Sequence, residues 1–343
     1  MVLLTDVFSK KGERKGYLGV ISLIGIILAF LFTLPQMGSV KSGFEGMFIS
    51  DGYALFFKVT FLIIAFLTVL ISMGYIQREG IEFGEYYALI LFATLGMMLM
   101  AAGSHLITIF LGLETMSISI YVLAGMMRED KRSVESALKY FLLGAFATGF
   151  LLYGIALIYG ATGSLHLKDI ASYIASKNLL KSPMLLMSLV FLTIGFGFKI
   201  ASVPFHMWTP DVYEGAPTSI TAFLATGVKA AGFSALIRVF FSALPAFRPD
   251  WTSIMWAIAV ATMTLGNIVA ISQTNIKRML AYSSIAHAGY ILVAFVSGNE
   301  LGTSGILFYL MAYAFMNLGA FGVVILLGKK GEEKVLIRDY AGI

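Results

Sequence analysis

The stretch GFGFKIASVPFHMW, residues 195–208, places a lysine inside an apolar run and a proline five residues after it. Both are costly within a membrane-spanning helix, because a charged side chain there costs roughly 3 kcal/mol and proline removes a backbone donor. Pro204 should clash with the carbonyl group four residues earlier, so we expect the helix to break near Lys199. Gly195 and Gly197 should loosen the preceding turn. Carbonyl groups freed by the break, together with water, would then solvate the ammonium group.

The composition excludes a water-soluble fold for the 343 residues. Apolar residues make up 59% of the chain and charged residues 13%, which leaves too little polar surface to cover a soluble body of this size. Long apolar stretches recur at short intervals, as in helical membrane proteins and unlike the short alternating segments of a membrane β-barrel. The chain has no cysteine, which excludes disulfides and thiolate-held iron–sulfur or zinc sites. The net charge of +5 reflects basic loops rather than nucleic-acid binding.

Ten apolar segments are each long enough to cross the roughly 30 Å hydrocarbon layer. We therefore predict an all-α polytopic membrane protein with spans at residues 17–35, 53–76, 86–103, 105–127, 136–160, 184–208, 216–242, 251–272, 279–297 and 301–328. The loops are short except between the fifth and sixth spans. Apolar residues at roughly helical spacing predict a surface helix there, with an apolar side formed by Leu167, Ile170, Ile174 and Leu180.

Basic residues in the loops predict the orientation. Fourteen lie on the side of the N-terminal tail, namely Lys10, Lys11, Arg14, Lys15, Arg78, Arg128, Lys131, Arg132, Lys277, Arg278, Lys329, Lys330, Lys334 and Arg338. Only five lie on the other side, namely Lys41, Lys168, Lys177, Lys181 and Arg248. Since cytoplasmic loops carry the positive excess, we expect the tail side to be cytoplasmic, and an even number of spans returns the C-terminal end to that side. No cleavable signal peptide is evident, and the first sixteen residues are interpreted as the end of a truncated span followed by a basic loop.

Four titratable side chains lie at similar membrane depth on four different spans, namely Glu114, Lys199, Lys229 and His287. An inert structural pair between Glu114 and one lysine would leave the second lysine and the histidine unexplained, although each buried charge is costly. In general, burial lowers the pKa of a lysine and a nearby carboxylate raises it, so a change in such a pair changes proton affinity. The pattern therefore favours a proton relay. For His287, a hydrogen-bonded core histidine is the alternative.

Other charged residues lie towards the tail-side ends of the spans. Lys139 either links neighbouring relays or extends to water, and Glu135, one turn earlier, is placed to pair with it. Asp211 and Glu214 lie in an expected loop, where they either attract protons or cap the next helix. The sequence contains no complete dinucleotide loop, no bis-histidine haem pattern and no metal-ligand spacing, so we predict no cofactor or metal in this chain.

Four motifs together resemble the antiporter-like membrane subunits of respiratory complex I. They are LGLETMSISIYVLAG (111–125), ALKYFLLGAFATG (137–149), FKIASVPFHMWTPDVYEGAPT (198–218) and KRMLAYSSIAHAGY (277–290). The form PDVYEGAPT is more similar to subunit N, the counterpart of mitochondrial subunit 2, than to the sister L and M subunits. The similarity runs through nearly all of the chain.

This resemblance implies a fourteen-helix fold built around two inverted five-helix repeats with broken helices at the centre. On that pattern, residues 1–85 form peripheral helices, 86–242 the first repeat with a proton half-channel, and 251–343 the incomplete start of the second, all within one transmembrane domain. One helix before the first span and three after the tenth would be absent. We therefore expect a fragment that does not pump unaided.

The resemblance also implies roles for individual residues. Glu114 matches the glutamate that pairs with a lysine, Lys199 matches the lysine beside the helix break, and Lys229 matches the central connecting lysine. Lys139 matches a further position on the connecting path. His287 falls where the family commonly has a histidine.

The function implied is that of a proton-translocating subunit of NADH:quinone oxidoreductase in the bacterial inner membrane. Its partners would be other membrane subunits, including sister antiporter-like subunits. NADH, FMN, iron–sulfur clusters and quinone would act elsewhere in the complex, and electron transport there would drive proton transport here by perturbing the Glu114–Lys199 pair. One alternative is a subunit of a multi-subunit Na⁺/H⁺ antiporter. A second is a structural membrane scaffold whose buried charges only pair helices.

Overall fold

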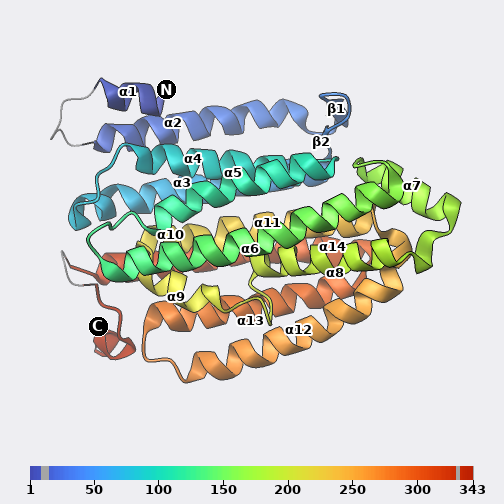
Figure 1. Cartoon of the computed structure of the whole chain (residues 1–343). Coiled ribbons are helices and arrows are strands. Elements are labelled where there is room, and N and C mark those ends of the chain that lie inside the picture. Colours follow the sequence, from blue (N-terminus) through green and yellow to red (C-terminus); the bar gives the residue numbers. More distant parts are fainter. Residues whose placement is uncertain (9–14, 330–332, 343) are drawn as a thin grey trace.

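The computed structural model of the chain describes residues 1–8, 15–329 and 333–342. Long helices run side by side, and both ends of the chain lie at the same end of the bundle (Figure 1). We call this the terminal end. The opposite end, which carries α7 (Leu167–Lys177) and a small β-hairpin, is the far end (Figure 1).

Ten helices in the described ranges are long and apolar enough to cross a membrane, which confirms the predicted number of spans. They are α2 (Gly16–Thr33), α3 (Gly52–Glu79), α4 (Glu85–Ala102), α5 (Leu106–Ala124), α6 (Lys131–Thr162), α8 (Pro183–Ile200), the joined α10 (Thr218–Phe223) and α11 (Lys229–Ser242), α12 (Arg248–Ile271), α13 (Ile276–Ser297) and α14 (Glu300–Leu327). The shorter elements are α1 (Val2–Val7), α9 (Trp208–Gly215) and the antiparallel strands β1 (Lys41–Gly43) and β2 (Phe48–Ser50), a hairpin that the hydropathy pattern did not predict.

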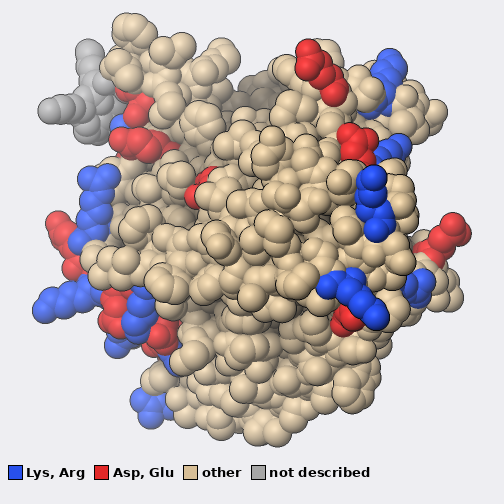
Figure 2. Space-filling view, turned by 45° about the vertical axis from the view of Figure 1, so that its right-hand side comes forward, with Lys and Arg blue, Asp and Glu red and all other residues tan. Residues whose placement is uncertain are grey.

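Charged side chains gather towards the two ends of the bundle on the face shown in Figure 2, and the broad surface between them carries few. Large apolar side chains such as Ile118, Phe146 and Phe308 are more than half exposed along the spans. A soluble protein would bury most of these groups. This arrangement is typical of a bundle surrounded by hydrocarbon.

The α10–α11 span is the centre of the bundle. Its most apolar stretch is entirely buried, whereas only 22% of the corresponding stretch of α12 is buried. The expected uninterrupted helix over 216–242 is wrong in one respect, because a π-helical turn, Leu224–Val228, lies directly before Lys229. Hydropathy does not reveal such a turn, since it changes the backbone hydrogen bonds and leaves the apolar pattern intact.

The predicted surface helix is present as α7. Leu167, Ile170 and Ile174 are buried along one side of it, as their spacing indicated. Leu180 does not belong to that side: it lies in the 3-10 turn that follows and is 43% exposed. Asn178, in the left-handed conformation with φ of 50°, ends the helix before Leu180.

Several of the basic residues that predict the orientation need separate comment. Lys10, Lys11, Arg14 and Lys330 lie outside the described residues. Lys277 is not a free loop cation, because it is buried in the first turn of α13.

Candidate functional site

The sixth span is broken. The helix α8 ends at Ile200, Ala201 adopts a left-handed φ of 59°, and helical structure resumes only at Trp208, the first residue of α9. The predicted break near Lys199 is therefore confirmed. Pro204 lies in the connecting segment beyond the helix end, so it marks the break without clashing with a helical turn.

Two carbonyl groups at the end of α8 accept hydrogen bonds from the residues that directly follow the helix. The N–H groups of Ala201 and Ser202 donate to the carbonyl oxygens of Phe198 and Gly197, at 3.1 and 2.9 Å. The expectation that freed carbonyl groups solvate the ammonium of Lys199 is therefore wrong. The ammonium reaches across to α5 instead.

The two glycines before the break serve close packing. Gly195 and Gly197 lie inside α8 rather than in a loosened turn. A Cβ atom at these positions would come within 2.6 Å of side-chain atoms of Leu151 and Phe205, respectively. The glycines thus let α6 and the connecting segment approach the helix.

Lys199 is 2% exposed and has only neutral partners. Its ammonium donates to Ser117 Oγ at 2.8 Å and to the Tyr121 hydroxyl at 3.5 Å, both on α5. The rings of Tyr121, Tyr140 and Phe198 surround it, with centroids 5.5, 5.8 and 5.6 Å away. Hydroxyl oxygens and ring faces stabilise an ammonium less than a carboxylate does. The site therefore holds the lysine without fixing it in an ion pair.

Glu114 lies on α5 three residues before Ser117, and the direct pair expected between Glu114 and Lys199 is not formed. Among the described residues, Glu114 Oε1 is buried without a hydrogen-bond partner. The carboxylate shares the face of α5 that carries Ser117, the partner of Lys199. The physical reason for the open pair is that Ser117, one turn along the same helix, accepts the hydrogen bond instead.

Lys229 follows the π-helical turn and is also 2% exposed. Its ammonium donates to the backbone oxygen and the side-chain oxygen of Ser284 on α13. The hydroxyl of Tyr213, on α9, lies 3.4 Å from Ser284 Oγ, and the ring centroid of Tyr313 lies 5.8 Å from the ammonium. Like Lys199, this lysine has neutral partners.

The two lysines lie on helices in direct contact. Gly232, three residues after Lys229 on α11, packs against the end of α8: a Cβ atom there would lie 3.4 Å from the Cβ atom of Lys199. A close approach of this kind needs a glycine. The structure thus brings the lysine-bearing turns of both helices together.

His287 lies one turn after Ser284 on α13 and is half-buried. Its Nδ1 hydrogen-bonds the hydroxyl of Tyr309 on α14. The histidine lies on the same stretch of α13 that receives Lys229, one turn from Ser284. Geometry therefore groups it with Lys229 more closely than with Lys199.

Lys139 lies apart from Glu114, Lys199, Lys229 and His287. Its side chain is 41% exposed near the terminal end of α6, where the ammonium is 2.7 Å from both Glu135 and Asp211. Asp211 also contacts Arg278, and Glu214 contacts both Arg278 and Arg132. Burial raises the pKa of Asp211, but the hydrogen bonds from Lys139 and Arg278 outweigh it and leave the pKa below its ordinary value. The expected loop is the helix α9, which holds this surface network.

Together, Lys199, Lys229, Glu114 and His287 provide two ammonium groups with neutral partners, one carboxylate and one imidazole. Such groups can take up and release protons. Within the described ranges, no three histidine, aspartate or glutamate side chains gather as metal ligands would.

Residues 103–343 match the family described as NADH:quinone oxidoreductase/Mrp antiporter, TM. A protein of Trichlorobacter lovleyi, the NADH-quinone oxidoreductase subunit N, is 55% identical over 342 residues, which cover all of this chain and 70% of the relative. The chain belongs to the subunit N family of NADH-quinone oxidoreductases. Members of this family are multi-pass membrane proteins, in agreement with the ten spans.

Solved structures extend this family assignment. A chain of respiratory complex I from Thermus thermophilus is 37% identical, with a TM-score of 0.77, and the match covers 93% of the present chain and 66% of the Thermus chain. A chain of the Mrp complex from Dietzia sp. shares 18% identity with a TM-score of 0.80, covering 95% of this chain and 62% of that one. This second likeness concerns the fold alone.

Sequence reasoning missed the hydroxyl partners of this subunit N family member. Ser117 and Ser284 receive the two buried ammonium groups, and Tyr121 and Tyr213 lie beside them. A signal was present for one of them, because Ser117 stands three residues after Glu114 and so shares its face of the helix. No local signal pointed to Ser284, because its partner is 55 residues away in the sequence.

Proposed function

We propose that this chain conducts protons across the bacterial inner membrane as a subunit of NADH-quinone oxidoreductase. Its partners are the other membrane subunits of that complex, including sister antiporter-like subunits. Family membership and the antiporter-like fold support this assignment. On this proposal NADH, FMN, iron–sulfur clusters and quinone belong to other subunits, and the chain contributes the proton path and no redox centre.

One observation carries the proposal: Lys199 and Lys229 are both buried, and both are held by neutral groups. An inert scaffold would set each ammonium against a carboxylate, because an unpaired buried charge is costly. Among the described residues, neither lysine has such a partner. A lysine held this way is free to change its protonation state as its surroundings move.

The geometry suggests how proton movement along this path is coupled to the redox reaction elsewhere in the complex. Glu114 and Ser117 lie one turn apart on α5, so a small shift of the Lys199 side chain exchanges a hydroxyl partner for a carboxylate. Formation of that pair favours the charged lysine, and its loss favours release of the proton. In our proposal, redox-driven movement elsewhere in the complex alternates the two states. The proton then passes from Lys199 to Lys229 and on towards His287.

The arrangement also supports an orientation. Both chain ends lie at the terminal end of the bundle (Figure 1). Loop lysines and arginines are in excess on that side. We infer that the terminal end faces the cytoplasm.

The test is Lys229→Ala in the full-length subunit within the assembled complex, in sealed vesicles. NADH-driven proton uptake and NADH:quinone turnover are recorded together, after assembly has been confirmed. We expect both to fall severely, because the path loses its central proton-carrying group. Lys168→Ala, at an exposed position of α7, is the matched control and should leave both rates unchanged.

The opposite result would contradict the relay. If the assembled Lys229→Ala complex pumps and turns over normally, Lys229 is dispensable and the buried charges act as scaffold. Double neutralisation of Glu114 and Lys199 separates the same alternatives: it preserves activity in a scaffold and abolishes pumping in a relay.

A further inference from the structure

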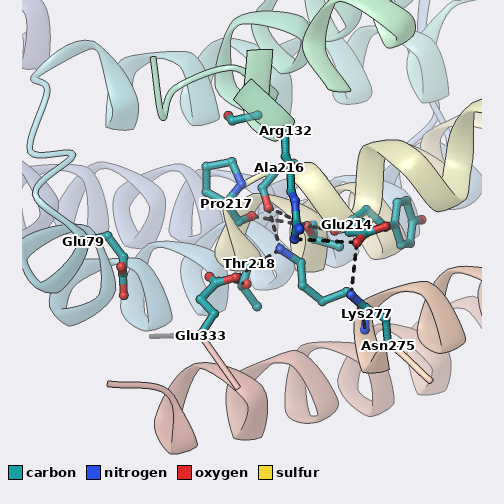
Figure 3. A network of polar contacts seen from close by, with 12 residues as sticks. Glu79, Arg132, Glu214, Ala216, Pro217, Thr218, Asn275, Lys277 and Glu333 are labelled. Atoms are coloured by element: carbon teal, nitrogen blue, oxygen red, sulfur yellow. Dashed lines mark hydrogen bonds and ion pairs between the residues drawn. The ribbon is translucent and has the colours of Figure 1, made fainter. Parts of the chain in front are cut away.

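A second polar site lies at the terminal end of the bundle, outside the row of Lys199, Lys229 and His287. Here a cavity of about 250 Å³ opens between α9, α13 and the segment after α14, and its lining includes Glu79, Glu214, Ala216, Lys277 and Glu333. Figure 3 shows the side chains of Lys277 and Glu333 approaching each other from different elements, close to Ala216 and Thr218. We call it the Lys277–Glu333 chamber.

Lys277 is an unusual residue for this position. It lies in the first turn of α13, where the positive end of the helix dipole disfavours a cation, and its side chain is 2% exposed. Its ammonium donates to the backbone oxygen of Ala216 at 2.8 Å and lies 3.5 Å from Glu333 Oε2. Unlike a purely structural cation, this lysine lines a cavity at the terminal end of the bundle.

Glu333 is brought to the chamber by a segment that docks on the α12–α13 loop. Ile276 N–H donates to the oxygen of Val335 at 2.7 Å, and Ile337 N–H donates to the oxygen of Thr274 at 2.9 Å. These two bonds fix the segment in place. A carboxylate from the end of the described chain thus becomes the partner of a lysine buried inside the bundle.

The carboxylate of Glu333 is kept ionised. Burial raises its pKa, but the charge of Lys277 and the hydrogen bonds from Tyr75 and Thr218, at 2.7 and 2.9 Å, outweigh that effect and leave the pKa below its ordinary value. Lys277 and Glu333 neutralise each other, and the other charged residues of the lining, Glu79, Asp130, Arg132 and Glu214, are acidic on balance. A positively charged chamber would repel an incoming proton, and this one does not.

The chamber shares two walls with the Lys229 site. On α13, Lys277 and Ser284 are seven residues apart, so they lie on the same face about 10 Å apart along the axis. On α9, Glu214 lines the chamber, whereas the preceding residue, Tyr213, hydrogen-bonds Ser284. Tyr213 and Ser284 therefore stand between the chamber and the Lys229 site.

We propose that the Lys277–Glu333 chamber is a proton-uptake port that supplies Lys229 past Tyr213 and Ser284. This inference rests on the proposed function, because it assigns an entry to the same path. In it, Glu333 is a positioning residue: it cancels the charge of Lys277 so that a proton from water at the terminal end can enter.

The test changes the charges of Glu333 and Lys277 while keeping side chains of similar size. Glu333→Gln, Lys277→Met and the double variant are compared in the assembled complex in sealed vesicles, with NADH-driven proton uptake measured per assembled complex. We expect Glu333→Gln to slow uptake several-fold, because Lys277 loses the carboxylate that pairs with it. Lys277→Met leaves the Glu333 carboxylate without its cation and should slow uptake less, and the double variant should return most of the rate. Glu129→Gln, an exposed carboxylate at the same end, is the control.

Other patterns overturn the port. Normal uptake in Glu333→Gln shows that protons enter elsewhere. Equal losses in both single variants and the double variant show a structural role, since a charge effect must reverse when both charges are removed. Lys229→Ala is measured in parallel: if it abolishes uptake while Glu333→Gln is normal, the port is wrong and the proposed function stands. If Lys229→Ala is itself normal, the proposed function has failed.

Discussion

The helix α11 carries two cations that have opposite kinds of partner, Arg238 and Lys229. Arg238, nearer the far end, donates to both carboxylate oxygens of Asp51, at 2.8 and 2.9 Å. Asp51 in turn accepts the N–H of Ala54 at 2.7 Å and caps α3. Lys229, nine residues earlier on the same helix, has only serine oxygens as partners. Arg238 is therefore locked in an ion pair, whereas Lys229 is held loosely by neutral acceptors.

This difference follows from chemistry. A guanidinium stays charged in a protein and matches a carboxylate with two parallel hydrogen bonds, so the Arg238–Asp51 pair fastens α11 to α3. A lysine is the cation whose protonation state a protein can change. Burial alone therefore does not mark a functional charge; the kind of partner does.

The most damaging change should be Arg238→Met. It leaves the half-buried Asp51 without its two hydrogen bonds from the guanidinium group, which we expect to destabilise the subunit by about 3 kcal/mol. The loss of stability is measured by heating the purified complex and recording how much of this subunit it retains. The protons moved per NADH oxidised should stay unchanged in whatever assembles, because the pair fastens helices and carries no protons.

Lys181→Met, at an exposed position of the same end, is the control and should unfold like the unmodified complex. If Arg238→Met assembles with normal stability but moves fewer protons, the distinction between locked and loosely held cations is wrong.

A smaller effect is expected from Gly232→Val. The added methyl groups must displace Ile200 and Lys199, since a Cβ atom alone would lie 3.1 Å from Ile200 Cγ2. Overpacking of this kind costs about 2 kcal/mol. Proton uptake should fall further than stability, because α8 and α11 are pushed apart where their lysines meet.

Gly319→Val is the control, because a Cβ atom at that position of α14 meets nothing within 4 Å. Equal slowing of proton uptake in both variants would show that the contact between α8 and α11 is not part of the path.

The smallest effect should come from Ser117→Ala. It removes a hydroxyl acceptor from the Lys199 ammonium at a cost of about 1 kcal/mol. Proton uptake in vesicles should slow several-fold while assembly stays normal. Ser117→Thr keeps the hydroxyl and should retain most of the rate; if Thr and Ala slow uptake equally, the hydroxyl group is not the relevant feature.

Sequence reasoning worked where the signal was local. The ten spans follow from hydropathy, and the broken span follows from a lysine and a proline placed together at residues 199 and 204. It failed where a residue's role depends on its neighbour from another helix. The sequence predicts a loop cation at Lys277, whereas the structure buries this residue. Its partners there, Ala216 and Glu333, are 61 and 56 residues away in the sequence.

The sequence by itself determined that residues 17–328 hold ten apolar spans with four titratable groups at similar depth, because the cost of burying charge in hydrocarbon is visible residue by residue. Only the tertiary structure decided what each charge touches. It set Arg238 against a carboxylate, Lys199 and Lys229 against hydroxyl groups, and Lys277 against Glu333. The physical reason is that partners are chosen by helix packing, which joins residues far apart in the chain.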